Sequence, residues 1–294
     1  MRILRPTVEI IKQEPKINGI FKQIERAGRV CYKSEDKITK DSAQGFVERM
    51  VRSGHMSVLE HGTVYLSIPL NNTWYTRFDV DPFSVIKLDH RHDKMCVTTN
   101  YRVLIENGWT DLLKKYLVDR TPTHERRVTV KFGTQIAISR EFNRHRANSV
   151  SESSTRYCNY SKDKFGNELT YNCPTWISDE DIENDRERIP DFDSLCREIG
   201  AGKHTIWNCI DWWWCANLFC EKAYLEMTRM GWTAEQARVI LPIDLNTEIV
   251  HTAFIKDWKH FIDLRADGVS GAPHPDARML AILLKEKFTE SRLL

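Results

Sequence analysis

Segments with the two-residue period of β-strands and segments with the period of amphipathic helices follow one another along almost the whole of this 294-residue chain. Strands are expected at 2–11, 63–68, 97–100, 128–132 and 248–255. Helices are expected at 18–31, 40–52, 110–117, 134–143, 192–230 and 257–266, and after Pro275. Because the two kinds of segment intermix along the chain, the sequence predicts an α/β (α+β) fold.

Residues 159–192 interrupt this pattern. They are polar and contain Gly166, Pro174 and Pro190, so they are predicted to form a long excursion with little regular structure. The helical region that follows carries four tryptophans, at positions 207, 212, 213 and 214. Because aromatic side chains dominate buried surfaces, these are interpreted as core or subunit-interface residues in preference to a ligand platform.

Charge and cysteine usage narrow the class of protein. The formal net charge is +2, so no global field favours nucleic acid, and any basic site must be local. The eight cysteines form no Cys-x-x-Cys pair and are too sparse for a disulfide scaffold, so most are expected to be reduced and buried. The chain shows neither a signal-peptide stretch nor a run of 18 apolar residues. A cytoplasmic protein without membrane contact is expected.

The densest chemical feature is the string Arg-His-Arg-Ala-Asn-Ser-Val-Ser-Glu-Ser-Ser-Thr-Arg-Tyr at 144–157. Arginine forks bind phosphate oxygens two at a time, and serine hydroxyls with turn N–H groups supply further donors. Glu152 would repel a phosphate, so its expected partner is a sugar hydroxyl or a ring N–H. The string therefore suggests a nucleotide site; the alternative is a solvated basic turn.

Three further strings carry candidate residues. The string at 54–61 is Gly-His-Met-Ser-Val-Leu-Glu-His, and the spacing of its histidines does not fit the His-Glu-x-x-His metal pattern. The simpler interpretation is that His61 is a structural residue whose ring nitrogens are hydrogen-bonded within the protein. Arg238 lies among apolar residues and needs an anionic partner, either a ligand or one of Glu235 and Asp244. Arg265 follows Asp263 and precedes Asp267, and is either a surface ion pair or a functional group.

The 144–157 string closely resembles the signature of flavin-dependent thymidylate synthases, R-H-R-x-x-S-x-N-E-x-S-x-R-Y, and only the family's Asn differs, being Ser151 here. Segments of the same family are similar to the other three strings, in the same order. The resemblance implies one domain over 1–294 with a mixed, largely antiparallel sheet flanked by helices. It also implies insertions at about 71–126 and 159–192.

The resemblance implies reductive methylation of dUMP to dTMP, with methylenetetrahydrofolate as carbon donor, NADPH as reductant and FAD as cofactor. It implies a homotetramer with active sites between subunits. Arg265 would be catalytic, stabilising negative charge on the uracil ring. The implied dUMP contacts are Arg144, Glu152, Ser153, Ser154, Thr155, Arg156, Arg238 and Arg265. The implied FAD contacts are His55, Ser57, Arg144, His145, Arg146, Ala147, Glu152 and His260.

Four features depart from the family pattern. Glu141 stands where the family often has Gln, Phe254 and His260 replace asparagines, and the segment 268–276 differs from the usual Ala-Gln-x-Glu. Two alternatives to the thymidylate synthase reading stay open. One is a non-catalytic RNA- or nucleotide-binding module, which would need more aromatic stacking than Tyr157 and Tyr160 provide. The other is a flavoenzyme of the same fold that acts on another pyrimidine nucleotide.

Overall fold

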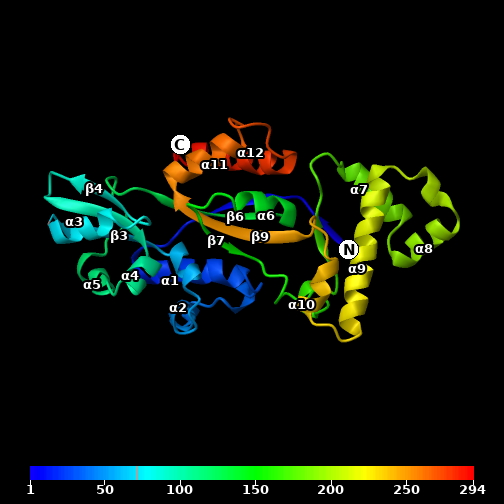
Figure 1. The fold of residues 1–294 in the computed structure, drawn as a ribbon, viewed down its shortest axis with the longest axis horizontal. Coiled ribbons are helices and arrows are strands. Elements are labelled where there is room, and N and C mark those ends of the chain that lie inside the picture. Colours follow the sequence, from blue (N-terminus) through cyan, green and yellow to red (C-terminus); the bar gives the residue numbers. More distant parts are fainter. Residues whose placement is uncertain (71) are drawn as a thin grey trace.

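A four-stranded antiparallel sheet forms the middle of the molecule (Figure 1). The computed structural model describes residues 1–70 and 72–294. The strand order is β2-β6-β9-β7, and the bounds are Thr7–Ile11 (β2), Arg127–Gln135 (β6), Ser149–Glu152 (β7) and Asn246–Phe254 (β9). The sheet therefore brings together segments from the start, the middle and the last quarter of the chain.

One face of this sheet packs against the last two long helices, α11 (Ile255–Arg265) and α12 (Pro275–Glu290). Val128, Val130 and Phe132 alternate along β6 and are all buried on this face, as the period of two dictates. Pro275 begins α12, where its missing N–H costs no hydrogen bond. α11 begins at Ile255, two residues before the predicted start of this helix, and its first turn has no side-chain cap within the described part of the chain.

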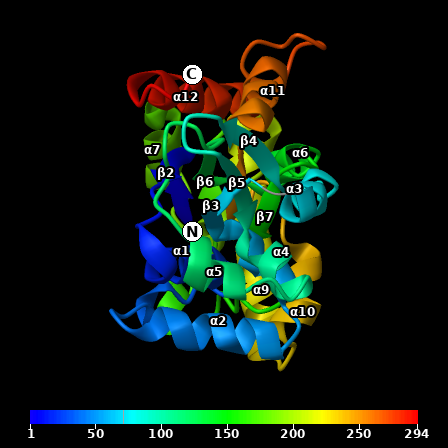
Figure 2. The same ribbon diagram turned by 90° about the vertical axis from the view of Figure 1, so that its left-hand side faces the viewer.

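The other face is covered by α1 (Lys16–Val30) and the 3₁₀ segment η2 (Met56–His61), and α2 (Ser42–Arg52) packs on the outer side of these two. Figure 2 shows α1 and α2 below the sheet, with α11 and α12 above it. α2 ends just before Gly54, whose φ of 73° lies in the left-handed region that glycine occupies without strain. This turn leads directly into η2 and so fixes where His55 and Ser57 lie.

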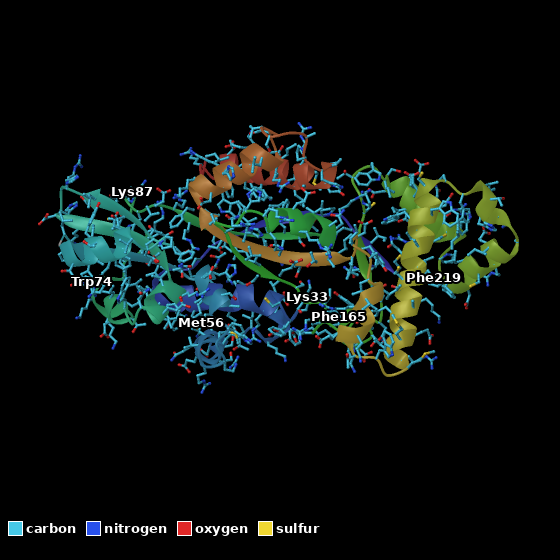
Figure 3. All side chains as sticks on the ribbon, in the orientation of Figure 1. Lys33, Met56, Trp74, Lys87, Phe165 and Phe219 are labelled. Atoms are coloured by element: carbon cyan, nitrogen blue, oxygen red, sulfur yellow. The ribbon has the colours of Figure 1, made fainter. Side chains whose placement is uncertain are left out.

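A second, three-stranded sheet in the order β3-β5-β4 forms one end of the molecule. Its strands are Thr63–Pro69 (β3), Val85–Asp89 (β4) and Lys94–Asn100 (β5), with helices Asn72–Asp79 (α3), Tyr101–Glu106 (α4) and Asp111–Tyr116 (α5). Most of the predicted 71–126 insertion lies here, around a core that includes Val64, Leu66 and Val97 and is shared with α1, α2 and η2. Trp74 and Lys87 mark this end in Figure 3, and Phe219 marks the opposite end.

The opposite end is helical and includes the 159–192 region. Its helices are Asp179–Arg188 (α7), Phe192–Gly200 (α8), Cys209–Arg229 (α9) and Ala234–Ala237 (α10). Strands Arg2–Leu4 (β1) and Thr170–Asn172 (β8) pair in parallel beside them. Short 3₁₀ turns complete the chain at Glu35–Lys37, Asp163–Phe165, Lys203–Ile206 and Arg238–Ile240. A capping box between Thr233 and Gln236 starts α10.

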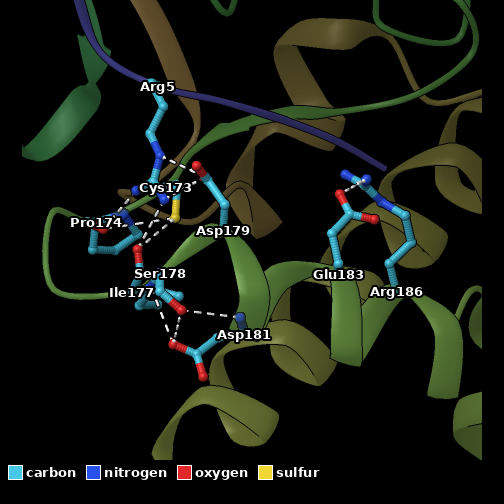
Figure 4. A network of polar contacts seen from close by, with 9 residues as sticks. All are labelled: Arg5, Cys173, Pro174, Ile177, Ser178, Asp179, Asp181, Glu183 and Arg186. Atoms are coloured by element: carbon cyan, nitrogen blue, oxygen red, sulfur yellow. Dashed lines mark hydrogen bonds and ion pairs between the residues drawn. The ribbon is translucent and has the colours of Figure 1, made fainter.

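The expectation that 159–192 lacks regular structure is wrong, because β8 and α7 lie within it. A capping box between Ser178 and Asp181 starts α7, and Arg5 donates to Asp179 at 2.6 Å and to the main-chain oxygen of Ile177 at 3.0 Å (Figure 4). The capping residues were visible in the sequence, but the long-range contact of Arg5 was not. The predicted α+β class, with largely antiparallel sheets flanked by helices, is confirmed.

Candidate functional site

Arg265 lies at the end of α11 and is held by α6 (Ile136–Phe142) and the turn that follows it. Its Nη1 donates to Oε2 of Glu141 at 2.7 Å, and its Nη2 donates to the main-chain oxygen of Glu141 at 2.8 Å. Its Nε donates to Nε2 of His145 at 3.2 Å. The guanidinium is therefore fixed by three bonds, and the Arg265 side chain retains 19% exposure. The string that contains Arg265 therefore contacts the Arg-His-Arg string of the same chain.

His145 points into the protein, between Arg265 and the ring of Phe261, whose centroid is 4.7 Å away. Burial lowers the pKa of His145 to about 4, and the nearby charge of Arg265 acts in the same direction. The neutral imidazole can therefore accept the bond from Arg265. Its neighbours Arg144, Arg146 and Ala147 are exposed, so the Arg-His-Arg segment offers two outward arginines and one inward histidine.

Glu152, at the end of β7, is held by donors from two elements. Its Oε1 accepts from Ser139 at 2.6 Å and from Thr247 at 3.0 Å, and its Oε2 accepts from Asn143 at 3.2 Å. All three donors are uncharged, so they fix the carboxylate without neutralising it. Ser139, Asn143 and Thr247 were not singled out in the sequence. The only available signal was that Ser139 and Asn143 share one face of a predicted helix.

The segment after β7 meets the string that contains Arg238. Nη1 of Arg238 donates to Oγ1 of Thr155 at 3.3 Å, and Nε of Arg156 donates to Glu235 at 2.7 Å. Ser153 is bound to the main chain of Glu248, and its hydroxyl donates to the Glu248 oxygen at 3.3 Å. The N–H of Ser154 donates to the Cys31 oxygen. The end of the 144–157 string and the string around Arg238 therefore lie side by side on one surface.

Arg238 is exposed, and neither internal carboxylate proposed as its partner pairs with it. Glu235 binds Arg156, and Asp244 accepts a bond from the indole N–H of Trp213 at 2.8 Å. Within residues 1–70 and 72–294, no carboxylate oxygen lies within 4.0 Å of the Arg238 guanidinium. An exposed, unpaired guanidinium beside Thr155 and Arg156 suits an incoming anion.

The 54–61 string divides into an exposed and a buried part. His55 and Ser57 are exposed, and Nδ1 of His55 lies 3.3 Å from Oγ of Ser53. His55 also lines a cavity of about 690 Å³ together with Arg29, Arg49 and Arg52. No hydrogen bond or ion pair of the described part of the chain joins His55 or Ser57 to residues 144–147.

His61, by contrast, is completely buried. Its Nδ1 lies 2.8 Å from Oγ1 of Thr252, and its Nε2 lies 3.0 Å from Oγ of Ser151. The structural reading of His61 is confirmed, and Ser151, the one departure from the signature, contributes one of its two partners. Across the described residues, no group of three or more His, Cys, Asp or Glu side chains could hold a metal ion.

Buried histidines should make stability depend on pH. Burial lowers the pKa of His61 and of His251 from 6.5 to about 3. The unfolded chain takes up a proton on each of these histidines near pH 6.5, whereas the folded chain does not. Below that pH the free energy of unfolding should therefore fall by roughly 1.4 kcal/mol per pH unit for each of the two histidines. Urea unfolding at about pH 7 and about pH 5 measures the loss. We expect His61→Asn to reduce this pH dependence and the exposed His90→Asn to leave it unchanged; an equal slope in all three proteins would contradict the assignment.

The antiparallel α+β fold places Arg265 beside His145 and Arg238 beside Thr155, and sequence comparison supplies the family. The chain belongs to the thymidylate synthase complementing protein family, whose model matches residues 15–72 and 89–291. The unmatched residues 73–88 cover most of α3 and most of β4. No curated protein matches the chain.

Two solved structures are similar to this chain. Both are of the UMP/dUMP methylase PolB from Streptomyces cacaoi, one bound with 5-Br UMP and the other with 5-Br dUMP. The similarity covers 99% of this chain in both cases, and 92% and 93% of the two PolB chains. Sequence identity is 15% and 16%, and the TM-score is 0.42 for both.

Two further expectations concern the chain as a whole. Among the residues that the structure describes, no helix combines the length and the apolar character needed to cross a bilayer. All eight cysteines are free. Burial raises the pKa of Cys158 and of Cys173 to about 11, and that of Cys215 to about 12, so these three remain thiols at neutral pH.

Proposed function

We propose that this protein is a flavin-dependent thymidylate synthase. It would methylate dUMP to dTMP with the carbon of methylenetetrahydrofolate and reducing equivalents from NADPH, through bound FAD. The observation that carries the proposal is the position of Arg265, bound to Glu141 and His145 beside the Arg-His-Arg segment, in a chain of this family. The raised pKa values of the buried cysteines agree with a reaction that needs no thiolate nucleophile.

The donor set fits an FAD molecule. Arg144 and Arg146 are exposed and, among the described residues, form no ion pair, so both are available to the anionic pyrophosphate. His55 lines a cavity rich in cations, and His260 is exposed with its ring 6.0 Å from that of His145. Ser57 and Ala147 complete the proposed flavin contacts. FAD would supply hydride transfer; the protein residues bind, orient and stabilise charge.

Arg156 and Arg238 would hold the phosphate of dUMP, with Ser153, Ser154 and Thr155 between them. Arg265 would face the uracil ring and stabilise the negative charge that develops on it, while remaining protonated. Glu152, fixed by three neutral donors, would accept a hydrogen bond from a ring N–H or a sugar hydroxyl. His145 would hold Arg265 in place through the neutral acceptor nitrogen.

Removal of Arg238 tests the phosphate site. We expect Arg238→Ala to raise the Kd for dUMP by about tenfold to a hundredfold, because one charge-assisted contact to the phosphate is lost. Calorimetric titration with dUMP measures this change, with Arg229→Ala on α9 as the control, since that arginine pairs with Glu226. An unchanged dUMP affinity in Arg238→Ala would remove Arg238 from the site.

We further propose a homotetramer with active sites between subunits. This would explain why His55 and Ser57 carry no contact to the Arg-His-Arg segment of their own chain. Light scattering during size-exclusion chromatography tests the assembly. A monomer that turns over dUMP would exclude shared sites.

The function itself is tested by flavin absorbance of the purified protein. NADPH should bleach it, and methylenetetrahydrofolate with dUMP should restore it. Release of tritium from dUMP labelled at ring carbon 5 should accompany turnover. Release from UMP but not from dUMP would identify a flavoenzyme for another pyrimidine nucleotide. A colourless protein that cannot be reconstituted with FAD, but binds RNA with a steep salt dependence, would reject catalysis.

A further inference from the structure

A second cavity lies between the two sheets, away from the residues assigned above. Its volume is about 670 Å³, within the range of small-molecule sites. The end of β2, the start of β6, β3, the turn after α5 and the C-terminus all contribute to its wall. None of the residues proposed to bind dUMP or FAD lines it. The cavity is therefore a separate feature of the fold.

Cations dominate the charged groups around this cavity. They come from four different segments of the chain: Lys12, Lys16, Arg120, Arg126 and Arg127. In the described part of the chain, none of the five pairs with a carboxylate within 4.0 Å. Three carboxylates also line the cavity. Of these, Glu14 already binds Lys22 and Arg26, while Asp119 and Glu290 are exposed to solvent.

Arg127 is the most unusual of the five, because it is 9% exposed. Its Nη1 donates to the main-chain oxygen of Glu60 at 2.9 Å, its Nη2 donates to Oγ of Ser149 at 3.0 Å, and its Nε has no acceptor. Burial lowers its pKa only to about 10, so it is a cation at neutral pH. The carboxylates of Glu60 and Asp257 act on this buried cation only from beyond 4.0 Å, so it is incompletely neutralised, and an anion in the cavity would stabilise it further.

The wall also has an apolar part, to which Ile20, Tyr65 and Leu293 contribute. A simple inorganic ion would leave this surface unused. We infer that the cavity binds a small amphipathic organic anion, in which a phosphate or carboxylate is attached to an apolar or aromatic body. The anionic group would lie toward the arginines, and the body would pack against the apolar wall.

A purely structural role for Arg127 is the alternative, because its bonds tie β6 to η2 and β7. Arg120 and Arg126 separate the two readings. Neither side chain bonds to another element in the described part of the chain. Burial lowers the pKa of Arg126, and the charge of Arg120 acts in the same direction, so the two like charges lie close together. A structural role needs no such concentration of charge, whereas an anion site does.

The test uses the full-length protein and the fluorescent anion 8-anilinonaphthalene-1-sulfonate, displaced by phenyl phosphate or by phenylacetate. We expect Arg120→Gln/Arg126→Gln to bind the probe about tenfold more weakly or worse, since two charge-assisted contacts are lost. The matched control Arg186→Gln/Arg229→Gln removes the same charge from α7 and α9 and should bind as the wild type does. Near-ultraviolet circular dichroism confirms that all variants are folded.

Arg238→Ala keeps this result apart from the proposed dUMP site. It should weaken dUMP binding and leave the probe affinity unchanged. Whichever of phenyl phosphate and phenylacetate displaces the probe more strongly identifies the preferred anionic group. Benzyl alcohol, which has no charge, should not displace the probe. Equal affinity in the Arg120→Gln/Arg126→Gln variant, loss of the probe in Arg238→Ala, or displacement by benzyl alcohol would each overturn the inference.

Discussion

Replacement of Arg265 by alanine should lower the rate of dUMP methylation by at least about a hundredfold to a thousandfold, because it removes the cation placed to stabilise charge on the ring. Flavin binding should persist, since the exposed Arg144 and Arg146 do not contact Arg265. Single-turnover formation of dTMP and the flavin absorbance of the same sample measure the two effects. Full turnover in Arg265→Ala would refute the proposed role.

Glu141→Gln is the matched control for this experiment. The amide oxygen can still accept from Nη1 of Arg265, and the main-chain oxygen of residue 141 still accepts from Nη2. The arginine should therefore keep its position, and methylation should stay within about tenfold of the wild-type rate. If Glu141→Gln lost as much activity as Arg265→Ala, the carboxylate and not the guanidinium would be the critical group.

Replacement of Trp258 by alanine should produce the largest loss of stability. The side chain is 0% exposed, its indole N–H donates to the Val128 oxygen at 3.0 Å, and its ring packs near Phe261 and Phe288. Truncation of a buried tryptophan costs about 3–5 kcal/mol through lost transfer energy and the cavity that remains. Denaturant unfolding measures the change in the free energy of unfolding.

Trp232 provides the comparison for Trp258. It lies after α9 and is 48% exposed, so Trp232→Ala should change the free energy of unfolding by no more than about 0.5 kcal/mol. Because α11 carries both Trp258 and Arg265, Trp258→Ala should also loosen the bond between Arg265 and Glu141. A loss below about 1 kcal/mol in Trp258→Ala would show that the core closes around the gap.

The contrast between 134–143 and 159–192 shows what local patterns can predict. The first segment has a clear apolar period, and a helix at Ile136–Phe142 follows a strand as expected. The second is polar, and its helix α7 depends on a capping box and on Arg5, which lies 174 residues from Asp179. Packing contacts of that range override a weak local signal.

The sequence suggested which kinds of side chain form the candidate site, but not how they are arranged. Arginine, serine and glutamate at 144–157 pointed to a nucleotide, and Glu141 stood out as a departure from the family. Its partner is Arg265, 124 residues away. Three other donors to the site, Ser139, Asn143 and Thr247, were not predicted, because hydroxyl and amide side chains are common on any polar face.

Periodicity, turn residues and the kinds of side chain in each motif are properties of short stretches, so the order of amino acids alone determined the α+β class and led to the prediction of a nucleotide site. Which arginine keeps a free guanidinium, which histidine stays neutral and which carboxylate is held by neutral donors were decided only by the tertiary structure. These properties depend on desolvation and on contacts between residues far apart in the chain, such as His145 and Arg265, which are separated by 120 positions. Neither exists until the chain has folded.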